Sequence, residues 1–187
     1  MKQIIIGLVV MLFAILVLVP QVQTEEVAGS SATISSDLER ENVISDSSYF
    51  VRKKIAIKRV LERYNSPLTH TAGSFIDTCI AYDLDCYLLP SISGVESGFG
   101  KHIAPGTYNP FGWGGGYTGF SSWEDGYDSV GRGLRENYLN LGATNIYAIG
   151  EIYAANPEWG NKVMYFMQEF QDEEERLSLQ MDGDQLE

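Results

Sequence analysis

The residue best suited to chemistry is Glu96, which lies at the end of a predicted helix, just before Gly98 and Gly100. It follows Val95 and comes four residues after Ile92, so it sits at the border of the predicted buried face. The negative end of the helix dipole and the apolar neighbours both disfavour the ionised carboxylate, which raises its pKa. A carboxylic acid that stays protonated near neutral pH can act as a general acid.

The segment after these glycines is rich in glycine and in aromatic residues, and reads Tyr-Asn-Pro-Phe-Gly-Trp-Gly-Gly-Gly-Tyr over 108–117. Aromatic rings offer flat apolar faces on which sugar rings stack. Cleavage of a glycosidic bond requires a protonated carboxylic acid beside the bound sugar. The glycine run at 114–116 lacks the preceding strand and the following Lys-Ser/Thr of a phosphate-binding loop. Together these features favour sugar chemistry.

Four motifs in sequence order resemble those of the family 73 glycoside hydrolases, which belong to the lysozyme-like superfamily. These enzymes are bacterial N-acetylglucosaminidases, also described as mannosyl-glycoprotein endo-β-N-acetylglucosaminidase-like. The first motif is shared with soluble lytic transglycosylases and specifies only the superfamily, whereas the later ones favour the glucosaminidase branch. The resemblance covers roughly residues 70–170, and its motifs are Glu96–Lys101, Asn109–Trp113, Phe120 with Trp123, and Tyr153–Pro157.

The resemblance implies that Glu96 is the general acid and that Tyr153 lines the cleft near the scissile bond. The other implied substrate-binding residues are Ser97, Asn109, Phe111 and Trp113. The expected reaction is hydrolysis of the β-1,4 bond next to N-acetylglucosamine in peptidoglycan, with glycan strands as partner and with neither metal nor organic cofactor. Two alternatives stay open: a lytic transglycosylase that uses the same glutamate, and a non-catalytic glycan-binding or cell-surface protein.

The sequence departs from the family pattern in its second carboxylate, which some members carry on a β-hairpin lobe after the glycine-rich turn. Here Glu124 and Asp125 are the only acids in the stretch 114–125, and both are interpreted as helix-capping residues. The distance test between retaining and inverting chemistry therefore cannot be applied. Either the 2-acetamido group of the substrate assists the reaction, or the 6-hydroxyl of the sugar replaces water.

Helices are expected to position these residues. The apolar spacing predicts them over 49–64, 71–82, about 85–97, 125–140 and 145–170, the last with a break at Asn156-Pro157. Pro90 predicts either a kinked first turn or a late start of its helix. Trp123 and Trp159 are interpreted as structural anchors beside a helix start and a break, and His102 as a surface residue. No alternating strand is apparent, so the expected fold is all-α or nearly so, with at most a small hairpin: a lysozyme-like helical domain with a substrate cleft.

The ends of the chain differ from its middle. Residues 1–20 contain an uncharged apolar run, Ile4–Val19, interpreted as a signal peptide or an N-terminal membrane anchor. Both readings place the domain outside the cytoplasm, secreted or tethered to the membrane by that segment alone. Residues 21–48 are predicted to be a disordered linker, 49–170 the folded domain, and 171–187 an acidic disordered tail. The net charge of −12 comes mostly from these flanks, which argues against nucleic-acid binding.

The two cysteines, Cys79 and Cys86, are seven residues apart, too far for a disulfide within one continuous helix. A bend at 83–85 would bring them together. The sequence thus leaves a disulfide and two buried free thiols as alternatives. Metal binding is not predicted, because His70 and His102 are far apart and no ligand spacing is present.

Overall fold

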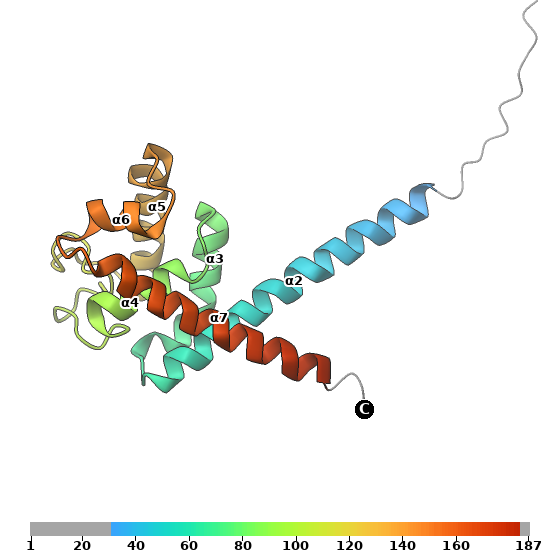
Figure 1. The fold of residues 1–187 in the computed structure, drawn as a ribbon, viewed down its shortest axis with the longest axis horizontal. Helices are drawn as coiled ribbons and strands as arrows, with labels where there is room; N and C mark the ends of the chain where they lie inside the picture. Colours follow the sequence, from blue (N-terminus) through green and yellow to red (C-terminus); the bar gives the residue numbers. More distant parts are fainter. Residues whose placement is uncertain (1–30, 184–187) are drawn as a thin grey trace, which may run out of the picture. The chain divides into compact units, whose positions relative to one another are not determined.

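The computed structural model describes the backbone of residues 31–183 and the side chains of 47–180, and its regular structure is helical (Figure 1). The α-helices are α2 (Ser31–Arg63), α3 (Ala72–Tyr82), α4 (Leu88–Ser97), α5 (Trp123–Asn137), α6 (Ile146–Tyr153) and α7 (Trp159–Gly183), with 3-10 turns η1 (Pro67–Thr71) and η2 (Leu139–Leu141). No strand occurs in this part of the chain, so the predicted all-α fold is confirmed.

The chain divides into two units, Met1–Asn42 and Val43–Glu187. The second unit holds the later part of α2 and every helix after it. The predicted targeting segment, Ile4–Val19, lies outside the described residues. Among the residues that are described, no helix combines the length and the apolarity that crossing a membrane requires.

Helix α2 begins within the segment that was predicted to be a disordered linker. Its later part has the expected amphipathic face, with Ile57, Val60 and Leu61 fully buried. Residues 31–48 are polar but contain neither glycine nor proline. Extending an existing helix costs far less than starting a new one, so the nucleus after residue 49 is sufficient to explain continuation upstream.

Helix α4 lies at the centre of the domain and is almost wholly buried. Its neighbours include α7, whose first part also packs on α6. A Cβ added to Gly94 would lie 2.7 Å from the ring of Phe99, so only glycine permits this packing. The helix begins at Leu88, which makes Pro90 its third residue, where the missing N–H has no partner to lose. Of the two predicted effects of Pro90, the late start is the one observed.

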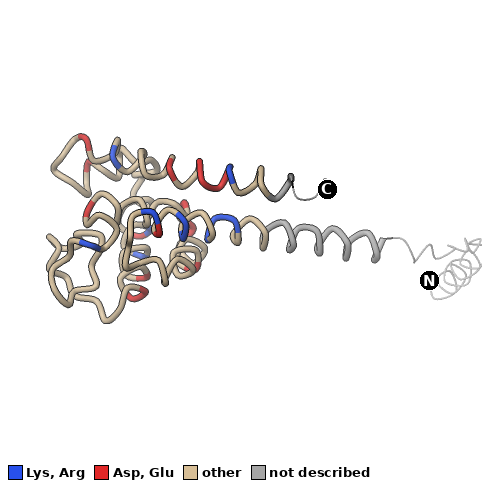
Figure 2. Tube along the Cα trace, turned by 90° about the horizontal axis from the view of Figure 1, so that it is seen from below, with Lys and Arg blue, Asp and Glu red and all other residues tan. Residues whose placement is uncertain are grey.

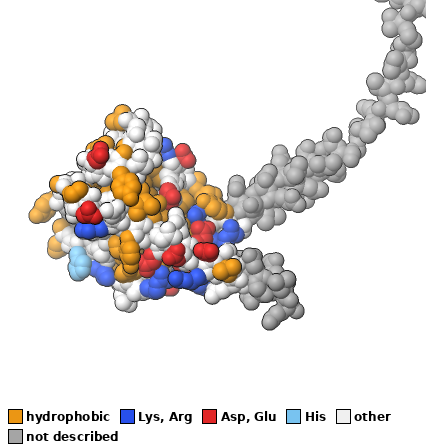
Figure 3. All heavy atoms as spheres, in the orientation of Figure 1, with side chains coloured by type: hydrophobic (Ala, Val, Ile, Leu, Met, Phe, Trp, Pro, Cys, Tyr) orange, Lys and Arg blue, Asp and Glu red, His pale blue; other side chains and the backbone are white. Residues whose placement is uncertain are grey.

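The predicted disordered tail is corrected by the structure, because α7 continues as a helix to Gly183. Figure 2 shows the acidic residues of α7 alongside the basic residues of α2, and hydrogen bonds join the two helices. Glu173 forms ion pairs with Arg59 and Arg63 across this interface, and only 7% of its side chain is exposed. Figure 3 shows acidic and basic side chains intermingled on the surface in this part of the molecule. Charge pairing between distant helices thus orders a segment that composition alone predicts to be solvated.

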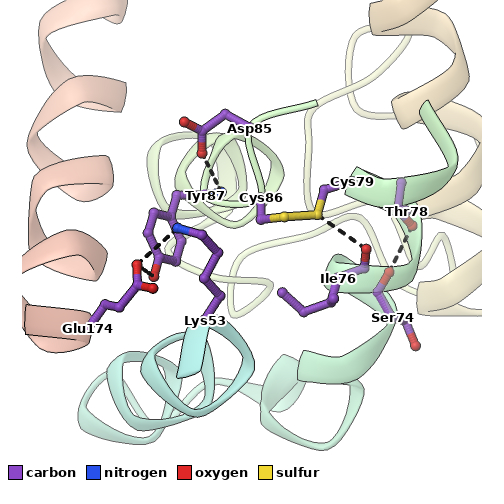
Figure 4. Close-up of a disulfide and its surroundings, with 9 residues drawn as sticks. All are labelled: Lys53, Ser74, Ile76, Thr78, Cys79, Asp85, Cys86, Tyr87 and Glu174. Atoms are coloured by element: carbon purple, nitrogen blue, oxygen red, sulfur yellow. Dashed lines mark hydrogen bonds and ion pairs between the residues drawn. A yellow bond between two sulfur atoms is a disulfide. The ribbon is translucent and has the colours of Figure 1, made fainter. Parts of the chain in front are cut away.

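A second contact between the same helices lies near the disulfide. Glu174 on α7 accepts hydrogen bonds from Lys53 Nζ at 2.9 Å and from the hydroxyl of Tyr87 at 2.6 Å (Figure 4). Cys79 at the end of α3 is bonded to Cys86 in the following loop, with 4.9 Å between their Cα atoms. The disulfide alternative is therefore the one observed, and the left-handed backbone of Asp83 (φ 49°) helps make the predicted bend.

Candidate functional site

Glu96 is the penultimate residue of α4, and its side chain is partly buried. The helix ends because Gly98 adopts the left-handed conformation, φ 57°, and donates its N–H to Gly94 O. Burial raises the pKa of the Glu96 carboxyl, and a hydrogen bond from Trp159 lowers it in part. The predicted direction of the pKa shift, and its cause in desolvation, are therefore found in the structure.

Trp159, the first residue of α7, is the hydrogen-bond partner of this carboxyl. Its indole Nε1–H donates to Glu96 Oε1 at 2.7 Å. The side chain is 3% exposed and stacks on Tyr153 with 4.9 Å between ring centroids. The sequence interpretation of Trp159 as only a structural anchor is incomplete, because the same side chain also contacts the candidate acid. The two residues are 63 positions apart, and no local pattern links them.

A hollow of about 170 Å³ with aromatic walls lies at Gly112, a residue that also approaches the Glu96 carboxyl. Three rings form these walls, and their centroids are 5.8–6.2 Å apart. Tyr153 and Trp113 were predicted to line a cleft and do line this hollow, whereas Tyr138 was predicted only as part of an apolar helix face. The hollow carries no charged side chain, and its lining consists of Gly112, Trp113, Gly114, Gly115, Tyr138 and Tyr153.

Gly112 connects the carboxyl to the hollow. Its φ of +64° favours glycine, and a Cβ at this position would lie 2.8 Å from Glu96 Oε2. Glycine thus keeps the space in front of that oxygen open. Gly112 both lines the hollow and approaches Glu96 Oε2.

The ring of Tyr153 lines the hollow, whereas its hydroxyl bonds to the backbone of the loop. The hydroxyl donates to the carbonyl oxygen of Phe111 at 2.7 Å. Burial, together with the negative charge of Glu96, raises the pKa of Tyr153 well above its ordinary value. Tyr153 is therefore a neutral hydrogen-bond donor that fixes the loop, and its ring is the part available to a ligand.

Phe111 and Asn109 are placed differently from the prediction. The ring of Phe111 is fully buried and packs edge-on against Tyr127, so it cannot stack on a sugar. Asn109 is also buried, and its amide binds the loop itself by donating to Trp113 O and Thr118 O. These two side chains shape the aromatic loop from within.

Ser97 is likewise buried rather than directed at a ligand. Its hydroxyl bonds to the carbonyl oxygen of Pro110 at 2.7 Å and accepts the N–H of Gly100 at 2.8 Å. The end of α4 is thereby joined to the loop that carries Gly112. Ser97, predicted to bind substrate, instead holds the acid and the aromatic loop in register.

The two other acids of this region lie in the first turn of α5. Ser122 caps the helix, and the carboxylate of Asp125 accepts hydrogen bonds from the N–H and the hydroxyl of Ser121. These bonds lower the pKa of Asp125. Glu124 and Asp125 thus lie at the start of this helix, but the cap that was predicted for them is made by Ser122. Trp123 packs edge-on against Tyr108, as expected of an anchor.

The arrangement offers one protonatable carboxyl beside an uncharged aromatic hollow. Within the described part of the chain, no group of three or more His, Cys, Asp or Glu residues has the geometry to hold a metal ion. No protein-family model matches this chain. A search of the curated proteins found no significant match either.

Proposed function

We propose that this chain is a peptidoglycan hydrolase that cleaves the β-1,4 glycosidic bond next to N-acetylglucosamine, with Glu96 as general acid. One observation carries the proposal: a partly buried carboxyl of raised pKa lies next to Gly112, which lines an uncharged hollow with aromatic walls. The resemblance of the motifs to family 73 glycoside hydrolases, within the lysozyme-like superfamily, supports the same activity.

In the proposed reaction a sugar ring lies in the hollow against Trp113, Tyr138 and Tyr153. Glu96 donates its proton to the glycosidic oxygen as the bond from that oxygen to the anomeric carbon breaks. Water then adds to the anomeric carbon, and its proton returns to the Glu96 carboxylate. The raised pKa keeps the carboxyl protonated to a higher pH than an exposed glutamate would allow.

A lytic transglycosylase is the second candidate, because the same Glu96 would serve it as general acid. No acidic residue lines the hollow, which fits this reaction as well as a hydrolysis in which Glu96 itself accepts the proton of water. The 6-hydroxyl of the sugar would then attack the anomeric carbon and an anhydro sugar would leave. Mass spectrometry of digested sacculi separates the two reactions, since hydrolysis leaves reducing ends and transglycosylation leaves anhydro ends.

We further propose that the domain acts outside the cytoplasm, either secreted or tethered to the membrane by its N-terminal segment. Two observations support this location. The apolar run Ile4–Val19 is typical of a targeting segment. The disulfide between Cys79 and Cys86 is of the kind that persists in oxidising compartments.

The activity is tested by replacing Glu96 with glutamine, which keeps the size and a hydrogen-bond acceptor for Trp159 but removes the acidic proton. We expect Glu96→Gln to lose clearing of a peptidoglycan gel, with its melting temperature unchanged or higher. The matched control is Glu136→Gln, an exposed acid on α5, which should clear the gel like the wild type.

Clearing by Glu96→Gln would falsify the assignment of the acid. A wild-type protein that binds sacculi but releases no soluble products would instead support the non-catalytic glycan-binding alternative. Both outcomes are read from the same digest, by gel clearing and by mass spectrometry of the supernatant.

A further inference from the structure

We infer that Trp159 and Gly112 together determine which oxygen of Glu96 carries the transferable proton, and that this oxygen is Oε2. The inference rests on the proposed function, because it concerns how the general acid is presented to a glycosidic bond. It makes Trp159 a positioning residue and Gly112 the opening through which the bond approaches.

The indole of Trp159 distinguishes between the two oxygens of the Glu96 carboxyl. An indole N–H can only donate, and the Nε1–H of Trp159 donates to Glu96 Oε1. A protonated carboxyl has one carbonyl oxygen and one hydroxyl oxygen, and the carbonyl oxygen is the better acceptor. The hydrogen bond therefore favours the form in which Oε1 is the carbonyl oxygen and the proton resides on Oε2.

The indole of Trp159 is held in place by its neighbours. Trp159 is nearly fully buried, and its ring lies within 25° of parallel to that of Tyr153. On another side it packs on Gly150, where an added Cβ would lie 3.0 Å from Trp159 Cε3. Packing thus holds the indole on two sides, with its N–H directed at Oε1 of Glu96.

Gly112 lies in front of the other carboxyl oxygen, Oε2. This oxygen is next to Gly112, which has no side chain and lines the aromatic hollow. A glycosidic oxygen that approaches past Gly112 meets the protonated oxygen of the acid. The sugar on one side of the bond then lies in the hollow against Trp113, Tyr138 and Tyr153.

The test compares Trp159→Phe, which keeps a stacking ring but removes the donor, with the wild type. The readout is the pKa of the Glu96 carboxyl, measured by carbon NMR without substrate and assigned with Glu96→Gln. A hydrogen bond to the ionised form lowers the pKa, so its loss should raise the pKa of Glu96 further. The alkaline limb of the plot of kcat/KM against pH should move to higher pH with it, and kcat should fall about 10- to 100-fold.

The matched control is Trp123→Phe on α5, which should change neither the pKa of Glu96 nor the kinetics.

A second measurement is made on the wild-type protein, with Trp159 intact. The indole N–H signal of Trp159, assigned with the Phe variant, should titrate in the wild-type protein with the same midpoint as the Glu96 carboxyl. In Glu96→Gln this titration should vanish. An unchanged Glu96 pKa in a folded Trp159→Phe, or an indole signal that does not follow Glu96, would overturn the inference even if the wild type is active. Failure of the proposed function is a different result: the wild-type protein would then release no products from peptidoglycan. The NMR signals of the Glu96 carboxyl and the Trp159 indole do not affect that result.

Discussion

The surroundings of Glu96 have a cost for stability as well as a use in chemistry. Its carboxyl has a raised pKa in the folded state, so the folded protein holds this proton more tightly than the unfolded chain. The ionised form is therefore destabilising at pH values above the unfolded pKa. This is why we expect Glu96→Gln to be at least as stable as the wild type at neutral pH, with any difference in stability disappearing in acid.

The space in front of Glu96 depends on Gly112, and the variant Gly112→Ala tests this. The new methyl group would lie 2.8 Å from Oε2, in the path proposed for the glycosidic oxygen. We expect loss of peptidoglycan cleavage together with a loss of stability of about 1–2 kcal/mol, because the residue has a positive φ. Product release and urea unfolding measure the two effects.

Gly106→Ala is the control for backbone strain. Gly106 has φ +76°, and a Cβ there would meet nothing within 4 Å. The control should lose about as much stability as Gly112→Ala yet retain cleavage. Equal activity in the two variants would show that Gly112 is needed only for its backbone conformation.

At the level of single residues, the sequence predicts features that depend only on residues close together in the chain. The position of Glu96 follows from Ile92, Val95 and Gly98, which are close to it in sequence. Trp159 could not be predicted as its partner because the contact is made only when α7 packs on α4. The opposite error affects Phe111, because an aromatic residue in a glycine-rich loop is equally suited to a ligand surface and to the core.

At the level of helices, apolar spacing predicts which elements exist better than where they end. Helix α5 stops at Asn137 and is followed by the separate turn η2, whereas the prediction ran on to residue 140. The start of α4 also differed, since the spacing predicted about residue 85 and the helix begins at Leu88, the late start that Pro90 had left open. Helix ends depend on tertiary contacts that a periodic pattern does not contain.

The interface between α2 and α7 yields a prediction for Glu173. Burial alone would raise the pKa of this carboxyl, but hydrogen bonds from Arg63 and Arg59 outweigh it and the pKa is lowered. A lowered pKa means that the ionised form stabilises the fold above the unfolded pKa, and that this stability is lost as pH falls through the folded pKa. We expect Glu173→Gln to cost about 1–3 kcal/mol at neutral pH, measured by urea unfolding.

The pH series distinguishes this interface from a general effect of charge. The difference between Glu173→Gln and the wild type should shrink as the pH is lowered below about 4. Glu175→Gln is the matched control, because Glu175 is an exposed acid on the same helix. If both variants lose the same stability, the buried ion pairs are not the cause.

At the level of the whole molecule, the fold class was predictable while the extent of the domain was not. Helical periodicity without alternating strands indicates an all-α fold from local sequence. The acidic run after residue 171 has the composition of a solvated tail, but its basic partners on α2 lie 110–121 positions earlier. Composition gives the number of charges but not which distant residues they pair with in the fold, so it could not predict these ion pairs.

Shortening the chain tests this assignment of the C-terminal helix. A protein that ends at residue 170 loses Glu173, Glu174 and the buried side chain of Leu177. We expect it to lose about 3–6 kcal/mol in urea unfolding, from the buried leucine and the charged hydrogen bonds together. Peptidoglycan cleavage should weaken with it, because the same helix carries Trp159 to Glu96. A chain that ends at Gln180 keeps all of these contacts and should behave as the full chain does. If the shorter protein melts like the full one, residues 171–180 contribute nothing to the fold and the compositional prediction of a solvated tail was right.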